Sequence, residues 1–164
     1  MKANKILILI ILTLCITLSI AAPAAARATR INYESYECTI APWGEPERMW
    51  VSEDGVMHMR GVLVVNLIES ENPYLAGINR LIMNVDLDPA TGEGHAYGTA
   101  LLTPSAKNGT WEGRFSTHIM PTGIRGKAVI HGTGELAGMK MFNKMSNSDP
   151  NDPCNNGAGY ILLP

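Results

Sequence analysis

The sequence contains little charge, few aromatic residues and few cysteines, and these shortages narrow the class of protein. Charged residues make up 17% of the 164 residues, aromatic residues 6%, and only three cysteines are present. No Gly-x-Ser-x-Gly motif occurs, so the sequence offers no support for a nucleophile elbow. No stretch after residue 28 has helical periodicity, which argues against a helical fold.

The first residues have the composition of a secretory signal peptide. Lys2 and Lys5 precede an apolar run over 6–22, and small residues follow up to Ala28. We therefore predict a signal peptide over 1–28, cut after Ala26 or Ala28, and a secreted or periplasmic protein. The alternative is an uncleaved membrane anchor, but the apolar run falls short of the about 20 residues that a spanning helix needs.

Cleavage would leave one acidic domain over 29–164 with two cysteines. Loss of Lys2, Lys5 and Arg27 leaves ten basic residues against fifteen acidic ones, a formal charge of −5 that argues against nucleic-acid binding. The remaining cysteines, Cys38 and Cys154, lie near the two ends of this domain. In an oxidising compartment such a pair is more often a disulfide than two free thiols, and a bridge across so long a loop stabilises by up to about 4 kcal/mol.

Alternating apolar and polar residues recur along the mature chain and predict an all-β fold. Turn signals such as Glu-Asp-Gly at 53–55 separate the alternating runs, and the short links favour antiparallel neighbours. The polar segment 143–157 is expected to be a loop held by the disulfide. The expected strands are 33–40, 48–52, 56–68, 78–88, 94–103, 110–119, 124–131, 135–142 and 158–163.

Glycine interrupts several of these expected strands. Examples are Gly94 and Gly98, Gly109 and Gly113, and the glycines of HGTGELAGMKM at 131–141. Glycine weakens a strand, so its repetition needs a cause. About eight strands must close or leave edges exposed, and closure needs tight bends that a residue without Cβ permits. We therefore predict a closed antiparallel barrel of about eight strands; no strand-to-helix turn supports a phosphate-binding loop.

Two segments combine these glycines with aromatic residues at similar spacing: GTWEGRF at 109–115 and PTGIRGKAVIHGTGELAGMKM at 121–141. The spacing resembles the strand, turn and Gly-x-Gly hairpin of the allene oxide cyclase and dirigent-like barrel group, over about residues 80–163. The resemblance implies a small eight-stranded antiparallel barrel, similar in shape to the calycins. Members of the group include a cyclase that acts on an oxylipin epoxide and proteins that direct radical coupling. None of its catalytic residues can be placed on this sequence.

Strand alternation separates the candidate site residues into two sets. Apolar candidates for the lumen are Met57, Met59, Leu63, Val65, Trp111, Phe115 and Tyr97, among which methionine would make a site adaptable. The opposite faces carry His58, Arg60, Glu112, Arg114, His118, Arg125, Lys127 and His131. If this polar set faces inward, it forms a cationic cavity for a carboxylate-bearing apolar ligand or for acid/base chemistry. If it faces outward, as is usual in a soluble barrel, it is a solvated surface.

These patterns predict a protein that binds a small apolar or amphipathic molecule, without a cofactor or metal. The histidines lie on separate strands with no His-x-His pair, and the acidic residues of the turns do not follow the spacing of a calcium loop. One alternative is a cyclase or isomerase assisted by Glu112 or a histidine. Another is a homo-oligomer formed through the 56–68 strand, which is apolar on both faces, so that Val62→Asp or Val64→Asp would give monomers.

Overall fold

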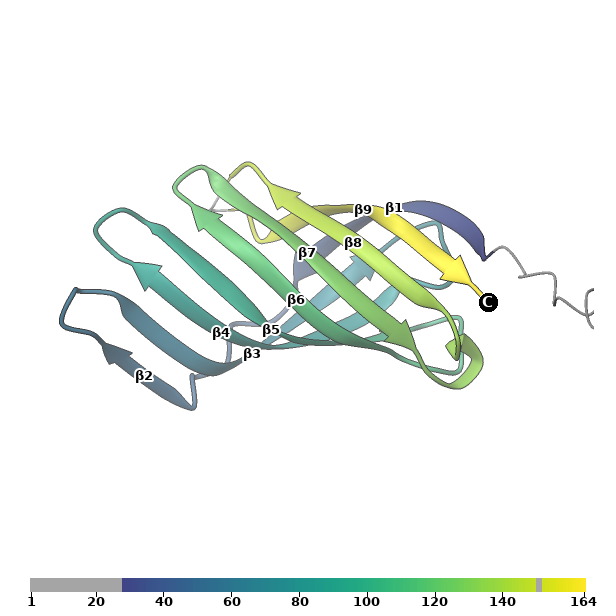
Figure 1. Ribbon diagram of the computed structural model, residues 1–164, viewed down its shortest axis with the longest axis horizontal. Helices are drawn as coiled ribbons and strands as arrows, with labels where there is room; N and C mark the ends of the chain where they lie inside the picture. Colours follow the sequence, from purple (N-terminus) through teal and green to yellow (C-terminus); the bar gives the residue numbers. More distant parts are fainter. Residues whose placement is uncertain (1–27, 150–151) are drawn as a thin grey trace, which may run out of the picture.

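A single antiparallel sheet of nine strands makes up the computed structural model (Figure 1). The structure describes residues 28–149 and 152–164, so the predicted signal peptide lies, except for Ala28, outside the described residues. Within these residues no helix has the length and hydropathy of a membrane span. The strands are β1 (Thr29–Thr39), β2 (Arg48–Val51), β3 (Met57–Glu69), β4 (Gly77–Asp88), β5 (Glu93–Pro104), β6 (Trp111–Met120), β7 (Gly123–Gly132), β8 (Lys140–Asn147) and β9 (Cys154–Leu163).

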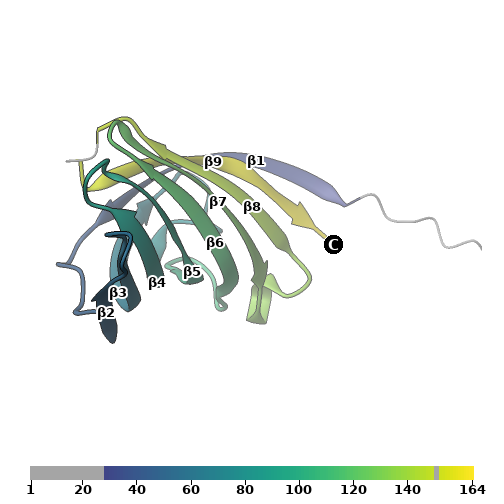
Figure 2. The ribbon, with the colours of Figure 1, turned by 60° about the vertical axis from the view of Figure 1, so that its left-hand side comes forward.

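Strand β1 closes the sheet into a barrel because it pairs on both sides. One edge of β1 pairs with β9 from Thr29 to Cys38, and the other edge pairs with β3 over the four residues Tyr36–Thr39. The ring therefore contains β1 and β3 to β9, whereas β2 lies outside it and extends the first part of β3 (Figure 2). The predicted closed antiparallel barrel of about eight strands is confirmed.

Two predicted boundaries near the C-terminus are wrong. The segment predicted as a strand over 135–142 begins instead with a 3-10 turn, η1 (Gly134–Leu136), and β8 starts only at Lys140. Gly134 and Gly138 have positive φ angles of 58° and 84°, so glycine is needed there for a tight connection. Most of the described residues in the expected loop 143–157 are strand, in β8 and β9, and polar residues such as Lys144 and Asn156 face solvent there.

Other glycines allow neighbouring strands to approach closely. A Cβ atom on Gly98 would collide with the carbonyl oxygen of Ile82 on β4, and a Cβ on Gly159 would collide with the carbonyl oxygen of Phe142 on β8. A side chain at either position would push the paired strands apart. These glycines therefore permit the tight curvature that a small closed barrel requires.

A β-bulge in β3 exchanges the two faces of that strand. The register with β4 shifts between Met59 and Val62, and Gly61 at the bulge has a φ of 71°. Met59 packs on the core side before the bulge, and Val62, 1% exposed, does so after it. Leu63 is consequently 45% exposed, so the predicted sharing of one face by Met59 and Leu63 is wrong.

The lumen is filled mainly by its own side chains. Trp111 and Ile161 are fully buried, and the Trp111 indole N–H donates to the carbonyl of Tyr74 over 2.8 Å. Leu75 in the β3–β4 connection and Leu136 in η1 are buried against this core at the same end of the barrel. Burial of these large side chains supplies the main hydrophobic stabilisation of the closed sheet.

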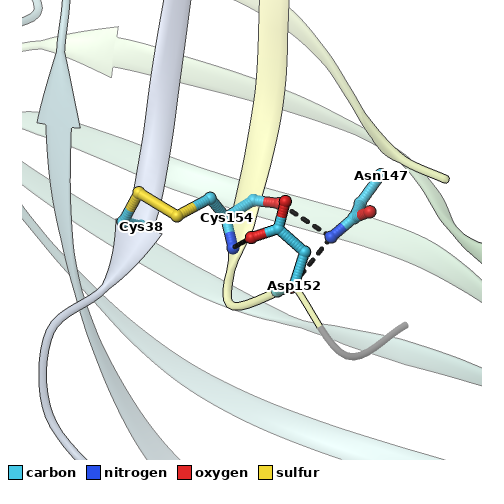
Figure 3. Close-up of a disulfide and its surroundings, with 4 residues drawn as sticks. All are labelled: Cys38, Asn147, Asp152 and Cys154. Carbon is cyan, nitrogen blue, oxygen red and sulfur yellow. Dashed lines mark hydrogen bonds between the residues drawn. A yellow bond between two sulfur atoms is a disulfide. The ribbon is translucent and has the colours of Figure 1, made fainter. Parts of the chain in front are cut away.

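The predicted disulfide between Cys38 and Cys154 is present (Figure 3). The two residues lie directly opposite each other in the β1–β9 ladder, 116 positions apart in sequence. Asn147 donates to the carbonyl oxygens of Asp152 and Cys154, and the Asp152 carboxylate accepts the Cys154 N–H over 2.9 Å. The bridge and these hydrogen bonds together fix β9 against the strand that closes the barrel.

The bulge gives a direct test of the fold at two adjacent residues. Val62→Asp would bury an unpaired carboxylate in the core, and we expect it to lower the free energy of unfolding by about 4 kcal/mol or more. Leu63→Asp, on the exposed face, should change it by less than about 1 kcal/mol. Urea unfolding of both variants measures the difference; equal losses, or folded monomers from Val62→Asp alone, would contradict this placement.

Candidate functional site in the barrel lumen

A buried carboxylate lies at the seam where β1 meets β3. Glu37 of β1 is only 5% exposed. Its Oε1 atom accepts hydrogen bonds from the side-chain amides of Asn66 on β3, over 2.9 Å, and of Asn79 on β4, over 2.6 Å. Asn66 and Asn79 are direct cross-strand partners, so the sheet register presents both amides to the same carboxylate. We call Glu37, Asn66, Asn79 and Asn143 the lumen cluster.

The lumen cluster has more hydrogen-bond acceptors than donors. A carboxylate can only accept, so the amide nitrogens of Asn66 and Asn79 must face Glu37 and their oxygens must face elsewhere. The buried Oδ1 atoms of Asn66, Asn79 and Asn143 have no hydrogen-bond partner among the residues that the structure describes. Each buried polar atom without a partner lowers the stability of the fold by about 1–3 kcal/mol, so additional hydrogen-bond donors would stabilise the cluster.

A small cavity of about 40 Å³ adjoins this cluster. That volume accommodates a water molecule or one polar group of a ligand. The wall is mixed, with a polar side formed by members of the cluster and an apolar side that contains two flexible methionines. Lining residues include Glu37, Asn79, Asn143, Tyr33, Ser35, Leu81, Leu102, Phe115, Ile130, Met141 and Met145.

The electrostatic character of the lumen is set by Glu37. Its carboxylate has no basic side chain within ion-pair distance in residues 28–149 and 152–164. Burial, followed by the charge of Glu37, raises the pKa of the Tyr33 hydroxyl far above its usual value near 10. That hydroxyl donates to the carbonyl of Phe142 over 3.3 Å. The lumen therefore favours donors and positive charge and opposes a second anion.

Only some of the residues predicted to bind a ligand lie on the core side. Trp111 and Phe115 are buried in the lumen. Met57 and Met59 also lie on the lumen side of the sheet, at the end of the barrel where the β2–β3 turn lies. The alternation of β3, β5 and β6, and the bulge in β3, turn the others outward: Leu63, Val65, Tyr97, His58, Arg60, Glu112 and His118. The polar set therefore does not converge in the lumen, whereas His118, Arg125 and Lys127 line a wide open groove that also borders Tyr33 and Met145.

The structure instead brings several of these outward residues together on the outer face. His58 Nδ1 lies 2.6 Å and Arg60 Nη2 2.7 Å from the same oxygen of Asp86. Burial by itself raises the pKa of Asp86, but the hydrogen bonds from His58 and Arg60 outweigh it and hold the pKa below its usual value. Trp50 stacks on His58 with ring centroids 4.9 Å apart, and the Arg60 guanidinium lies 5.9 Å from the Tyr97 ring.

A cross-strand row continues from this group around the barrel. Asp86 is opposite His95, and His95 is opposite His118, so three of the four histidines occupy one row with Asp86. The rings of His95 and His118 lie 5.3 Å apart, and His95 Nε2 lies 2.8 Å from Ser116 Oγ. In the part of the chain that the structure describes, no three metal-ligating residues converge on one point.

Sequence reasoning missed the lumen cluster. Its signal was present in β3, where Asn66 interrupts an otherwise apolar run, and in β1, where Glu37 alternates with Tyr33 on one face. The register that brings Asn66, Asn79 and Glu37 together depends on barrel closure and on the bulge in β3. Pairwise alternation along single strands cannot reveal it.

Comparison with known proteins identifies no family for this chain. No family model matches the sequence, and no curated protein matches it. The lumen cluster and the outer face are therefore the features of this chain that bear on its function.

The raised pKa of Tyr33 predicts a loss of stability in alkali. Below about pH 10 the tyrosine is protonated in both states; above it the unfolded chain loses this proton while the folded chain keeps it, so unfolding becomes more favourable. Urea unfolding at about pH 9 and pH 11 should show a shallower decline for Tyr33→Phe than for wild type, by up to about 1 kcal/mol per pH unit. Tyr36→Phe, on the exposed face, is the control; identical slopes for all three proteins would contradict the burial of Tyr33.

Proposed function

We propose that this protein is a secreted or periplasmic barrel that binds a small amphipathic molecule in its lumen, with the polar end of the ligand against the lumen cluster. The observation that carries the proposal is the set of buried Oδ1 atoms on Asn66, Asn79 and Asn143 that lack donors in the described chain. Asn79 and Asn143 line the cavity, so a ligand group with O–H or N–H donors placed there would satisfy oxygens that the barrel leaves unsatisfied.

The charge of Glu37 narrows the chemistry of the polar end. A buried carboxylate without a basic partner is stabilised by an ammonium or hydroxyl group and destabilised by a carboxylate. The proposed ligand is therefore an amine or alcohol. The sequence suggests a ligand with a carboxylate. We propose the opposite charge preference because the basic side chains lie on the outer face and not in the lumen.

The size of the cavity sets how the ligand would fit. The cavity beside the lumen cluster has a volume of about 40 Å³, which is enough for a polar group but not for an alkyl chain. Met141 and Met145 line the same cavity, and unbranched methionine side chains can change rotamer at low cost. We propose that these methionines move to make room for the apolar part of the ligand.

The compartment is supported by two observations. The Cys38–Cys154 bridge is of the kind that persists in oxidising compartments, and the first 28 residues have the composition of a secretory signal. A protein in that location would meet ligands that have crossed or left a membrane, which suits an amphipathic molecule.

An isomerase or cyclase is the second candidate, and the position of Glu37 favours it. A carboxylate held by two amides inside a closed lumen is suited to moving a proton on an enclosed substrate. Glu112, the acid considered from the sequence, is exposed on the outer face. The resemblance to the allene oxide cyclase and dirigent-like group is compatible with this candidate but locates no catalytic residue.

Three ligands with the same alkyl chain test the binding proposal: decylamine, decanol and decanoate, each titrated calorimetrically below its micellar concentration. We expect the amine and the alcohol to bind, and decanoate to bind at least about tenfold more weakly than the amine, a difference of about 1.4 kcal/mol. Glu37→Gln should abolish the preference of the lumen for the amine over decanoate.

Glu112→Gln is the matched control because it removes an acid from the outer face and should leave all three affinities unchanged. Equal affinities for the amine and decanoate in wild type would contradict the proposal. An unchanged preference in Glu37→Gln would also contradict it, because the charge would then act from elsewhere.

A further inference from the structure

We propose that Ser52, His58 and Asp86 form a second site, on the outer face, which hydrolyses small esters through an acyl-serine intermediate. Ser52 Oγ lies 3.1 Å from His58 Nε2, and His58 Nδ1 lies 2.6 Å from Asp86 Oδ1. A hydroxyl, an imidazole and a carboxylate in hydrogen-bond contact in that order are the arrangement that activates a serine nucleophile. The three residues come from the β2–β3 turn, β3 and β4.

The imidazole of His58 is held firmly in this arrangement. Trp50 stacks on one face of the ring at 4.9 Å, and the guanidinium of Arg60 fixes the Asp86 oxygen that His58 contacts. The carboxylate accepts from Nδ1, which leaves Nε2 free of its proton and directed at the serine hydroxyl. Asp86 is thus a positioning residue, whereas Ser52 and His58 would contact the substrate.

The site is open to solvent, and the backbone N–H that follows Ser52 would serve as a donor for the developing oxyanion. The side chains of His58 and Asp86 are 20% and 32% exposed, so a small ester can reach them. The backbone N–H of Glu53, the residue after the nucleophile, donates no hydrogen bond within the described chain. Such an N–H is one of the donors that stabilise the oxyanion in serine hydrolases.

The reaction balances without a cofactor. Ser52 Oγ attacks the ester carbonyl carbon as its proton passes to His58 Nε2; the bond to the alcohol oxygen then breaks, and the alcohol leaves with that proton. Water attacks the acyl carbon and gives a proton to His58, the bond to Ser52 breaks, and the proton returns to Ser52 Oγ. The products are one carboxylic acid and one alcohol per ester and water consumed.

Asp54 and the carbonyl oxygen of Val56, which lies 3.0 Å from Ser52 Oγ, compete with His58 for the serine proton. Ser52 Oγ also donates to Asp54 Oδ1 over 2.5 Å, and this hydrogen bond, followed by that from the Val56 N–H, lowers the pKa of Asp54. The negative charge of Asp54 beside the serine also opposes an oxyanion. Removing that charge should therefore make Ser52 more reactive, so Asp54→Asn is an activating variant.

The outer face supplies a matched control for the geometry. Ser116 Oγ lies 2.8 Å from His95 Nε2, so it has a histidine partner just as Ser52 does. No carboxylate contacts the ring of His95 in the described residues. If the carboxylate on His58 matters, a serine-directed reagent will distinguish the two serines.

The test treats the disulfide-bonded mature protein with diisopropyl fluorophosphate and locates the adduct by peptide mass spectrometry. We expect modification of Ser52 at least about tenfold faster than of Ser116. Hydrolysis of p-nitrophenyl acetate should fall at least about tenfold in Ser52→Ala and in His58→Gln, remain at the wild-type rate in Ser116→Ala, and rise in Asp54→Asn. Circular dichroism checks that each variant is folded.

The role of Asp86 is read from two variants that differ in whether the carboxylate is kept. Asp86→Asn should slow the labelling of Ser52 because the amide replaces the carboxylate that accepts the His58 Nδ1 proton, whereas Asp86→Glu keeps a carboxylate and should restore part of the rate. Equal labelling of Ser52 and Ser116, wild-type hydrolysis in Ser52→Ala, or equal labelling rates in Asp86→Asn and Asp86→Glu would each overturn the proposal.

Discussion

The pairing of β1 with both β9 and β3 is the constraint on which the rest of the structure depends. Only four residue pairs join β1 to β3, so this seam is the shortest ladder of the ring. Two consecutive residues of the seam have separate tasks: Glu37 points into the lumen, and Cys38 forms the disulfide to β9. The bridge therefore stabilises the strand that carries the buried carboxylate, and closure of the barrel and formation of the lumen cluster occur together.

The two faces of the barrel wall have opposite chemistry. Inside, three amide oxygens near the Glu37 carboxylate lack donors in the described chain, and most of the other residues around them are apolar. Outside, the basic residues and the histidines lie along the strands, and one oxygen of Asp86 contacts both His58 and Arg60. Because the wall is one sheet thick, each inward residue has outward neighbours in the chain. Two sites of different character can therefore lie on the same strands, and β3 and β4 contribute to both.

Much of the architecture was predictable because it follows from local pattern. Alternation predicted the strands, the repeated glycines predicted closure, and the presence of two cysteines after residue 28 predicted the disulfide. The faces of β3 were not predictable, because the bulge at Gly61 exchanges them, which moves Val62 inward and Leu63 outward. The same limit hid both proposed sites: Glu37 and Asn79 meet only through barrel closure, and Ser52 meets His58 through a turn with no sequence motif.

A crystal structure of the disulfide-bonded protein, at a resolution that shows ordered water, would show directly whether the lumen cluster takes up a hydrogen-bond donor. We expect density in the cavity beside Asn79 and Asn143, from a water or a ligand, within hydrogen-bond distance of at least one of the amide oxygens that lack donors in the described chain. An empty cavity, with these amides turned to pair with one another and Glu37 in contact with a basic side chain, would contradict this expectation.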